Sequence, residues 1–188
     1  MDLPTPFVHR SLRHEASIRV LVLRPSPRRS APIRCELQEI SLEDAPSYEA
    51  LSYVWGSPTG THPISCDGFT MLVTPNCRDA LIHLRRRVTR RILWVDAICI
   101  DQGESDRSKK ERNTQVVQMG KVYQTARRVV IWLGTADQGT RGLFSRLKLV
   151  TPYDLAFVLM DEVAKLSEIT EKLPKRISKA ARVMTFVG

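Results

Sequence analysis

The chain has 188 residues, enough for one well-buried core, and it carries a formal net charge of +9. Its hydrophobic content of 43% is ordinary, and no apolar run approaches the roughly 20 residues that span a bilayer. The first residues lack the basic start and apolar stretch of a secretory signal. Four widely spaced cysteines predict reduced thiols in an intracellular protein, rather than disulfides or zinc. No membrane-spanning helix is therefore expected, and composition sets no function.

The first half of the chain is expected to be mostly strands. Residues 1–17 lack periodicity and predict a loose lead-in. Three later segments have a strand-like pattern or composition and end near Gly, Pro or Ser, which predicts strands at 18–23, 33–40 and 48–55. The pair Asp67-Gly68 lies between two short apolar runs, 63–66 and 69–73, and is a strong hairpin signal.

The middle of the chain is expected to alternate helix and strand. A helix opens at Pro75, with Thr74 or Asn76 as its cap, because apolar residues recur at helical spacing up to Val88. The apolar run 93–100 predicts a buried strand, although it contains one acid and an acid-amide pair follows it. Such a carboxylate is costly unless it is paired, hydrogen-bonded or used.

A second helix over 108–126 is expected, followed by a buried strand at 129–133. The apolar stripe of that helix comprises Val116, Met119, Tyr123 and Ala126. Strand, helix and strand over 92–133 form a βαβ unit, so the two strands should be parallel with a right-handed crossover. We predict an α/β fold with a mixed, partly parallel sheet flanked by helices and an antiparallel hairpin element in the N-terminal half. The domain spans 18–140, and a helical extension, 141–188, follows.

Two polar clusters follow predicted strands. In open α/β sheets ligands bind beyond the carboxyl ends of the strands, so both clusters are expected to face one crevice. The clusters consist of Ser52, Tyr53, Trp55 and Gly56 after one strand and Asp96, Asp101 and Gln102 after the other. On the second helix Glu111, Gln115 and Gln118 share a face beside the apolar stripe. That face suits either a side chain reaching into a cleft or a plain hydrogen bond to a neighbouring loop.

Each candidate has two interpretations. Asp96 is either a buried carboxylate that caps backbone amides or pairs with an arginine, or an acid that contacts a ligand. Trp55 is either a core anchor at a tight turn or a stacking surface. The sequence contains no GxGxxG, no P-loop and no paired metal spacing among its histidines, so neither a standard nucleotide site nor a metal site is predicted.

A run of arginines supplies much of the positive charge. It comprises Arg78, Arg85, Arg86, Arg87, Arg90 and Arg91. The run is interpreted either as a solvated helix face or as an anion-binding patch. No aromatic residues interleave with the arginines, so a platform for stacking nucleic-acid bases is not expected.

Five ordered blocks resemble the heterokaryon incompatibility (HET) domain of filamentous fungi. The matching residues are 48–56 (YEALSYVWG), 76–81 with Leu84-Arg85, 93–102 (LWVDAICIDQ), Glu111 with 115–119 and Tyr123, and 130–134 (VIWLG). They cover about residues 48–134 in the order and near-spacing of the family. Residues 135–188 match no pattern, which indicates a truncated C-terminal region.

The resemblance implies a cytoplasmic fungal protein that acts in non-self recognition and programmed cell death, a form of innate immunity. The family is similar to Toll/interleukin-1 receptor (TIR) domains, which assemble by self-association or with protein partners, and the predicted core is accordingly TIR-like or flavodoxin-like. Some TIR domains hydrolyse NAD with a glutamate. By that likeness Glu111 and Asp96 are the candidate catalytic residues, and no cofactor other than NAD as substrate is expected. The candidate ligand-binding residues are Ser52, Trp55, Gly56, Asp101, Gln102 and Gln115.

Three functions from different classes follow. Death signalling through assembly leads, because a family resemblance coincides with missing catalytic motifs. An NAD-cleaving hydrolase with Glu111 as acid or base is the first alternative, which leaves enzymatic activity undecided. A basic nucleic-acid-binding module is the second alternative.

Overall fold

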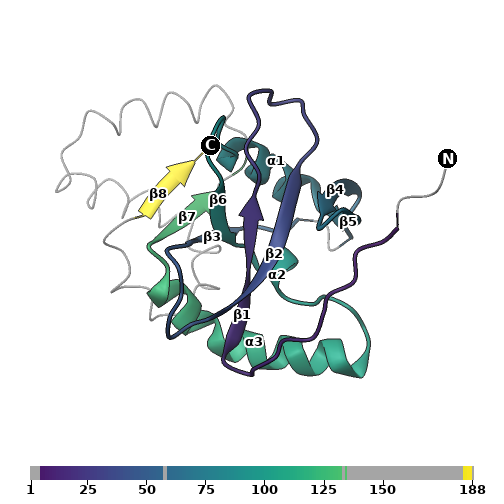
Figure 1. Cartoon of the computed structure of the whole chain (residues 1–188), viewed down its shortest axis with the longest axis vertical. Helices are drawn as coiled ribbons and strands as arrows, with labels where there is room; N and C mark the ends of the chain where they lie inside the picture. The colour runs from purple at the N-terminus through teal and green to yellow at the C-terminus, as the bar shows by residue number, and fades with distance from the viewer. Residues whose placement is uncertain (1–4, 57–58, 133, 135–183, 188) are drawn as a thin grey trace. The chain divides into compact units, whose positions relative to one another are not determined.

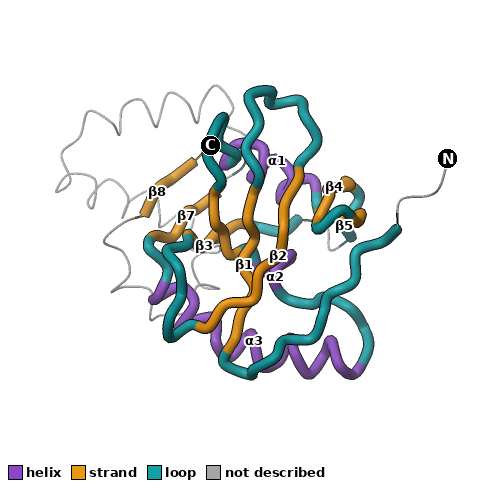
Figure 2. The backbone as a smooth tube through the Cα atoms, in the orientation of Figure 1, coloured by secondary structure: helices purple, strands orange, loops and turns teal. Residues whose placement is uncertain are grey.

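The computed structural model describes residues 5–56, 59–132, 134 and 184–187 of the chain (Figure 1). All of them belong to one compact unit. Within these residues the strands form one eight-stranded mixed sheet in the order β5-β4-β2-β1-β6-β3-β7-β8 (Figure 2). The elements are β1 (Ser17–Leu23), β2 (Arg34–Ser41), β3 (Glu49–Tyr53), β4 (His62–Cys66), β5 (Phe69–Val73), α1 (Pro75–Leu84), β6 (Arg91–Trp94), α2 (Asp96–Cys99), α3 (Asp106–Thr125), β7 (Arg128–Trp132) and β8 (Met184–Val187). The predicted α/β class with a mixed sheet is confirmed.

The N-terminal half is antiparallel, as the sequence predicts. β1 is buried along its whole length and pairs with β2 over seven residues. β4 and β5 form the predicted hairpin, and its turn places Asp67 at φ 52° and Gly68 at φ 86°. Two successive positive φ values match a two-residue type I′ turn, which glycine and aspartate tolerate. The hairpin joins the sheet through a short parallel pairing of β4 with β2.

The C-terminal half of the sheet is parallel. β3 pairs in parallel with β6 on one side and with β7 on the other. The two strands of the predicted βαβ unit are therefore parallel to each other, but β3 lies between them. Because all three strands run the same way, their carboxyl ends meet at one edge of the sheet, where the polar clusters were expected.

The two long helices cover opposite faces of the sheet. Trp132, which is in register with Tyr53, hydrogen-bonds through its indole to α1. Trp94, which is in register with Ala50, packs edge-on against Tyr123 of α3 with 5.4 Å between ring centroids. Positions 50 and 53 of a strand point to opposite faces, so α1 and α3 sandwich the sheet. The large apolar side chains of the sheet are thereby removed from water on both sides.

The predicted strand 93–100 is wrong after Trp94. Asp96–Cys99 instead forms the helical turn α2, in which the Cys99 amide donates to the Val95 carbonyl at 2.7 Å. β6 pairs with its neighbours only between Arg91 and Trp94, so the following residues satisfy their backbone groups locally. The turn still buries Ile98 and Cys99, which explains why an apolar run resembled a strand.

Two helix details also differ from the prediction. α1 ends at Leu84, and Val88 is 84% exposed rather than part of the core. On α3 the predicted Met119, Tyr123 and Ala126 do pack in or against the core, whereas Val116 is 53% exposed and Gln115 and Val122 are buried. Gln115 is buried in place of Val116 because its amide donates a hydrogen bond to the Ser17 carbonyl, which a valine could not make.

The ends of the chain depart from their predicted forms. The lead-in is irregular as expected, but it is anchored: the Phe7 amide donates to the Thr70 carbonyl at 2.7 Å, and the Thr70 amide donates to Thr5 at 2.9 Å. The predicted helical extension, 141–188, falls mostly outside the described residues. Its described part, Met184–Val187, is not helical but forms β8 and pairs in parallel with β7. None of the described helices is long and apolar enough to cross a membrane.

Candidate functional site

Trp55 and Asp96 meet at the carboxyl edge of the parallel strands. The Trp55 indole nitrogen lies 3.1 Å and 3.0 Å from the two carboxylate oxygens of Asp96. The first residue follows β3 and the second follows β6, which are neighbours in the sheet. The predicted convergence of the two polar clusters at one edge therefore occurs at this pair.

The Asp96 carboxyl has no cationic partner among the described residues. It accepts hydrogen bonds from the Ala97 amide at 2.7 Å and from Trp55, and it is half-buried. Burial raises the pKa of Asp96, and these hydrogen bonds only partly offset that effect. The arginine pairing considered for this acid is thus not made. The pKa of Asp96 is raised, whereas those of the other candidate acids, Asp101 and Glu111, are lowered.

Asn76 ties the exits of β3 and β7 together. Its amide nitrogen donates to the Val54 carbonyl at 2.5 Å, and its oxygen accepts from the Trp132 indole at 2.7 Å. Asn76 is not the helix cap, because Thr74 fills that role by accepting from the Cys77 amide at 3.2 Å. The edge around Asp96 is consequently held by side chains from two strands and α1.

Tyr53 and Ser52 lie just behind this edge. The Tyr53 hydroxyl is buried beside the Cys77 thiol, and no oxygen or nitrogen partner reaches it within the described part of the chain. Burial raises the pKa of Tyr53 far above its usual range, so the hydroxyl stays protonated. Ser52 faces the opposite side of the sheet, toward α3, where the Tyr123 hydroxyl donates to the Leu51 carbonyl at 3.4 Å. Gly56 is exposed and has a φ of 73°, which explains a glycine at the turn after β3.

Glu111 is separated from that pair and is committed to an ion pair. Its two oxygens accept from the Arg19 guanidinium at 2.6 Å and 2.9 Å, and one also accepts from the Asp101 amide at 3.2 Å. Burial by itself would raise the pKa of Glu111, but the hydrogen bonds and charge of Arg19 outweigh it and lower the pKa. Within the described residues no hydrogen bond or ion pair links Glu111 to Asp96 or Trp55.

The remaining candidates also hold the framework. Asp101 accepts from the Gly103 amide and the Ser108 hydroxyl, both at 2.9 Å, and thereby shapes the loop before α3. Burial would raise the pKa of Asp101, but these hydrogen bonds and nearby positive charge lower it. Gln102 donates to the Asp96 carbonyl at 3.3 Å, and Gln115 donates to the Ser17 carbonyl at 2.9 Å.

A small hollow lies next to part of this network. It has a volume of about 380 Å³ and opens between the N-terminal segment and the loop after α2. Asp101 and Gln102 line it, whereas Trp55 and Asp96 do not. The single predicted crevice is therefore divided: the Trp55–Asp96 pair lies at one place and Asp101 with Gln102 at another.

The residues that sequence reasoning missed come from the first strand and the lead-in. Arg19 is 5% exposed, and besides Glu111 it donates to the Cys99 carbonyl at 3.0 Å. His9 contacts the Ile98 carbonyl at 2.8 Å, and burial lowers its pKa. The sequence gives one sign that Arg19 matters: it is a charged residue among the apolar residues of β1, and a buried charge needs a partner. The identity of the partner, 92 residues away, was not available from the sequence.

The arginine run lies mostly in the loop after α1 rather than on a helix face. Arg85 donates to four backbone carbonyls of the loop before β2, those of Arg28, Arg29, Ala31 and Pro32. Arg91 pairs with the buried carboxylate of Glu49 at 2.7 Å, and Arg128 binds the same carboxylate at 2.8 Å. The side chains of Arg87 and Arg90 are exposed to solvent. Much of the run therefore stabilises the fold.

Replacing Arg85 by alanine is expected to lower the free energy of unfolding by about 1–2 kcal/mol, because four carbonyls lose a charged donor. Replacing exposed Arg87 by alanine is the matched control and should change it by less than about 0.5 kcal/mol. Urea unfolding of both variants measures the difference. Equal effects would contradict a structural role for Arg85.

Comparison with known proteins identifies the chain. A model of the family "Heterokaryon incompatibility protein (HET)" matches residues 48–182, well over half of the sequence.

The chain belongs to the heterokaryon incompatibility family.

One relative of this HET protein is "Heterokaryon incompatibility protein 6, OR allele" of Neurospora crassa, which is 37% identical over 132 residues. The match covers 63% of this chain and 19% of the relative, so the chain spans only a small part of that protein's length. No solved structure shows a significant match.

The family blocks of this HET domain contact one another in the structure. Tyr48 donates through its hydroxyl to the Val122 carbonyl at 2.6 Å, which joins the first block to the α3 block. Trp55 joins the first block to the third, and Asn76 joins the second to the last. The part of the chain that the structure describes contains no group of three metal-ligating side chains, and its four cysteines are buried free thiols.

Proposed function

We propose that this HET domain acts in fungal non-self recognition and programmed cell death, working in the cytoplasm through self-association or partner-triggered assembly. The observation that carries the proposal is the family match over residues 48–182. The 37% identical relative, whose name places it in heterokaryon incompatibility, supports it.

The geometry of the family residues supports signalling through surfaces. Most of their polar groups form bonds inside the domain. Glu111 pairs with Arg19, Asp101 bonds within its own loop, and Gln115 bonds to β1. Residues used in this way make a rigid frame and leave few groups to act on a small molecule. A rigid frame is what a module needs in order to present fixed surfaces to other proteins.

The proposal is tested by induced expression of the chain in a filamentous fungus. Death of the hyphae should follow at expression levels at which the purified chain forms assemblies, as measured by sedimentation. Arg87→Ala, in an exposed side chain that has no ion pair within the described part of the chain, is the control that should kill equally well. Full viability with folded protein present at those levels would contradict the proposal.

One observation favours an enzymatic alternative, cleavage of NAD. Asp96 is a half-buried acid without a cationic partner in the described residues, and its raised pKa suits proton donation. It is a better candidate for the acid than Glu111, whose carboxylate is neutralised by Arg19. In this alternative Trp55 orients Asp96, and Glu111 holds the loop that carries Asp101.

The enzymatic alternative is tested by incubating the purified chain with NAD at several protein concentrations. Wild type is compared with Asp96→Asn and Glu111→Gln. Absence of NAD loss, even in assembled protein, would rule out the alternative. NAD loss that survives both substitutions would contradict only the assignment of these two residues.

A further inference from the structure

Among the described residues, β2 has a free edge along more than half of its length. On one side it pairs with β1 at every residue from Cys35 to Ser41. On the other side it pairs with β4 only at Arg34 and Cys35, because the β4–β5 hairpin ends there. Residues 37–41 of β2 therefore pair with β1 on one side but have no pairing with β4 on the other.

The backbone groups of alternate residues point to that free edge. The carbonyls of Ile33 and Cys35 accept from the hairpin, and the Leu37 amide donates to the Asp67 carboxylate at 3.4 Å. Outward-pointing groups recur every second residue in an antiparallel pair, so those of Glu39 and Ser41 point the same way. Among the described residues no backbone bond satisfies the amide or carbonyl of Glu39 on this side.

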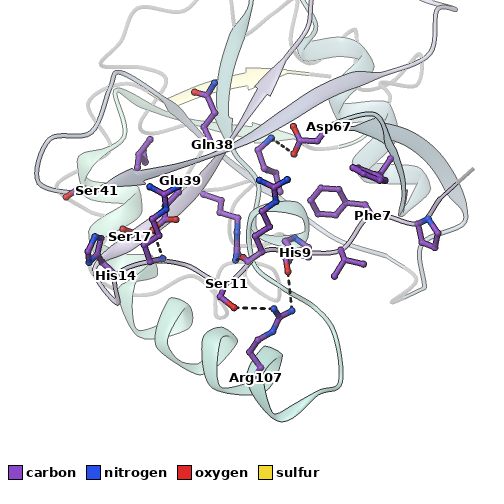
Figure 3. Close-up of a pocket in the computed structure, with 18 of the residues that line it drawn as sticks. Phe7, His9, Ser11, His14, Ser17, Gln38, Glu39, Ser41, Asp67 and Arg107 are labelled. Carbon is purple, nitrogen blue, oxygen red and sulfur yellow. Dashed lines mark hydrogen bonds between the residues drawn. The ribbon is translucent and has the colours of Figure 1, made fainter.

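A groove is lined by the same part of β2. Its volume is about 1290 Å³, and one wall is formed by residues 37–41 of β2. The other wall is the N-terminal segment from Thr5 to His14, which Arg107 of α3 anchors by donating to the Ser11 hydroxyl and the His9 carbonyl (Figure 3). Gln38, Glu39 and Ser41 lie across the groove from Phe7, His9 and Ser11 in the same view. The space is therefore bounded on one side by a strand and on the other by the irregular N-terminal segment.

The charge of the groove favours an acidic occupant. Arg10, Arg13, Arg19 and Arg107 line it together with two carboxylates, Glu39 and Asp67, but Arg19 and Arg107 are already paired with Glu111 and Asp101. The side chains of Arg10 and Arg13 are exposed and form neither a hydrogen bond nor an ion pair within the described residues. A second copy of this chain carries the same charge of +9 and would be repelled, whereas an acidic peptide would be attracted.

We propose that the free edge of β2 binds an extended acidic peptide segment of a partner protein as an added strand. The five residues from Leu37 to Ser41 give an edge of about 16 Å, enough for a peptide of five or six residues. Backbone hydrogen bonds to Glu39 and Ser41 would hold the strand, and acidic side chains would meet Arg10 and Arg13. This mode of recognition gives affinity through the main chain and selectivity through the side chains.

The backbone contribution is tested with the full chain and an eight-residue probe of alternating valine and glutamate, capped at both ends. Glu39→Pro removes the outward amide, which β1 does not use, and proline is tolerated at a strand edge. Glu39→Ala is the matched control, since it loses the same side chain but keeps the amide. By titration calorimetry the proline variant should bind the probe at least tenfold more weakly than the alanine variant.

In the wild-type chain the probe should shift the backbone amide resonances of residues 37–41 and protect them from hydrogen exchange. This measurement does not depend on whether the proline variant folds. Equal affinity of the two Glu39 variants, or resonance shifts confined to other strands, would overturn the proposal.

The charge contribution is tested by Arg10→Glu with Arg13→Glu, which should weaken probe binding at least tenfold. Arg87→Glu with Arg90→Glu makes the same change of charge in the loop after α1 and should leave binding unchanged. A probe with lysine in place of glutamate should bind more weakly than the acidic probe. Dimerisation that is lost in Glu39→Pro, with no binding of the acidic probe, would overturn the proposal and assign the edge to a second copy.

Discussion

Replacing Arg19 by leucine is expected to lower the free energy of unfolding at pH 7 by about 3–5 kcal/mol. The side chain of Arg19 is 6% exposed and that of Glu111 is 11% exposed, so the substitution leaves a nearly buried carboxylate without its cation. The Cys99 carbonyl also loses its donor. Urea unfolding followed by circular dichroism measures the loss.

Two variants separate the buried pair from ordinary surface charge. Arg24→Leu breaks an ion pair with Glu36 in which the arginine side chain is 52% exposed, and it should cost less than about 1 kcal/mol. Arg19→Leu combined with Glu111→Leu should recover part of the loss, because no lone charge remains buried. A double variant less stable than Arg19→Leu alone would contradict this explanation.

The same pair gives the domain an acid-sensitive component of stability. The pKa of Glu111 is lower in the folded state than the usual value of about 4.3, so this component is complete above that value. It is lost as the pH falls through the folded pKa, because the carboxylate takes up a proton and releases Arg19. The dependence of stability on pH below about 4.3 should therefore be weaker in Glu111→Gln than in wild type.

In the enzymatic alternative, in which Asp96 acts on a ligand, replacing Asp96 by asparagine is expected to abolish the proposed death signal. The free energy of unfolding at pH 7 should stay the same or rise by about 1 kcal/mol. The pKa of Asp96 is raised by burial, so ionising it weakens the folded state. Stability should fall as the pH rises from about 3.9 through the raised folded pKa, and asparagine removes that fall. Asparagine still offers an oxygen to Trp55 and Ala97.

Hyphal viability and urea unfolding, measured on the same variant, check this expectation. Asp106→Asn, at an exposed position in the first turn of α3, is the control and should preserve both signalling and stability to within about 0.5 kcal/mol. Death at the wild-type level with Asp96→Asn would show that the acid serves the fold alone. A loss of several kcal/mol would show that the hydrogen bonds of Asp96 outweigh the cost of its burial.

Much of the secondary structure could be predicted because its signals are local. Alternation of apolar residues predicts β1, the pair Asp67-Gly68 predicts the β4–β5 hairpin, and Thr74 with Pro75 predicts the start of α1. The error at 93–100 has the same origin. A short apolar run fits a strand and a buried helical turn equally well. The choice depends on how far the neighbouring strands pair with β6, and that pairing stops at Trp94.

The candidate site could be predicted only in part. Residues that share a sheet edge were expected to converge, and Trp55 does meet Asp96. Glu111 was placed correctly on α3 but not with its partner, because nothing in the residues around either position indicates that Arg19 faces it. The sequence suggests either a solvated helix face or an anion-binding patch for the arginine run, yet Arg85 and Arg91 bind groups far from them in sequence.

The sequence by itself determined the family, the α/β class and most element positions, because ordered blocks, hydrophobic periodicity and turn residues are properties of neighbouring positions. The tertiary structure decided which charged groups form ion pairs inside the domain and which stay unpaired. It paired Glu111 with Arg19, left Asp96 without a cation in the described residues, and ended the β4–β5 hairpin short of Ser41. Those outcomes depend on burial and on contacts between distant segments, whose energies no local pattern of residues specifies.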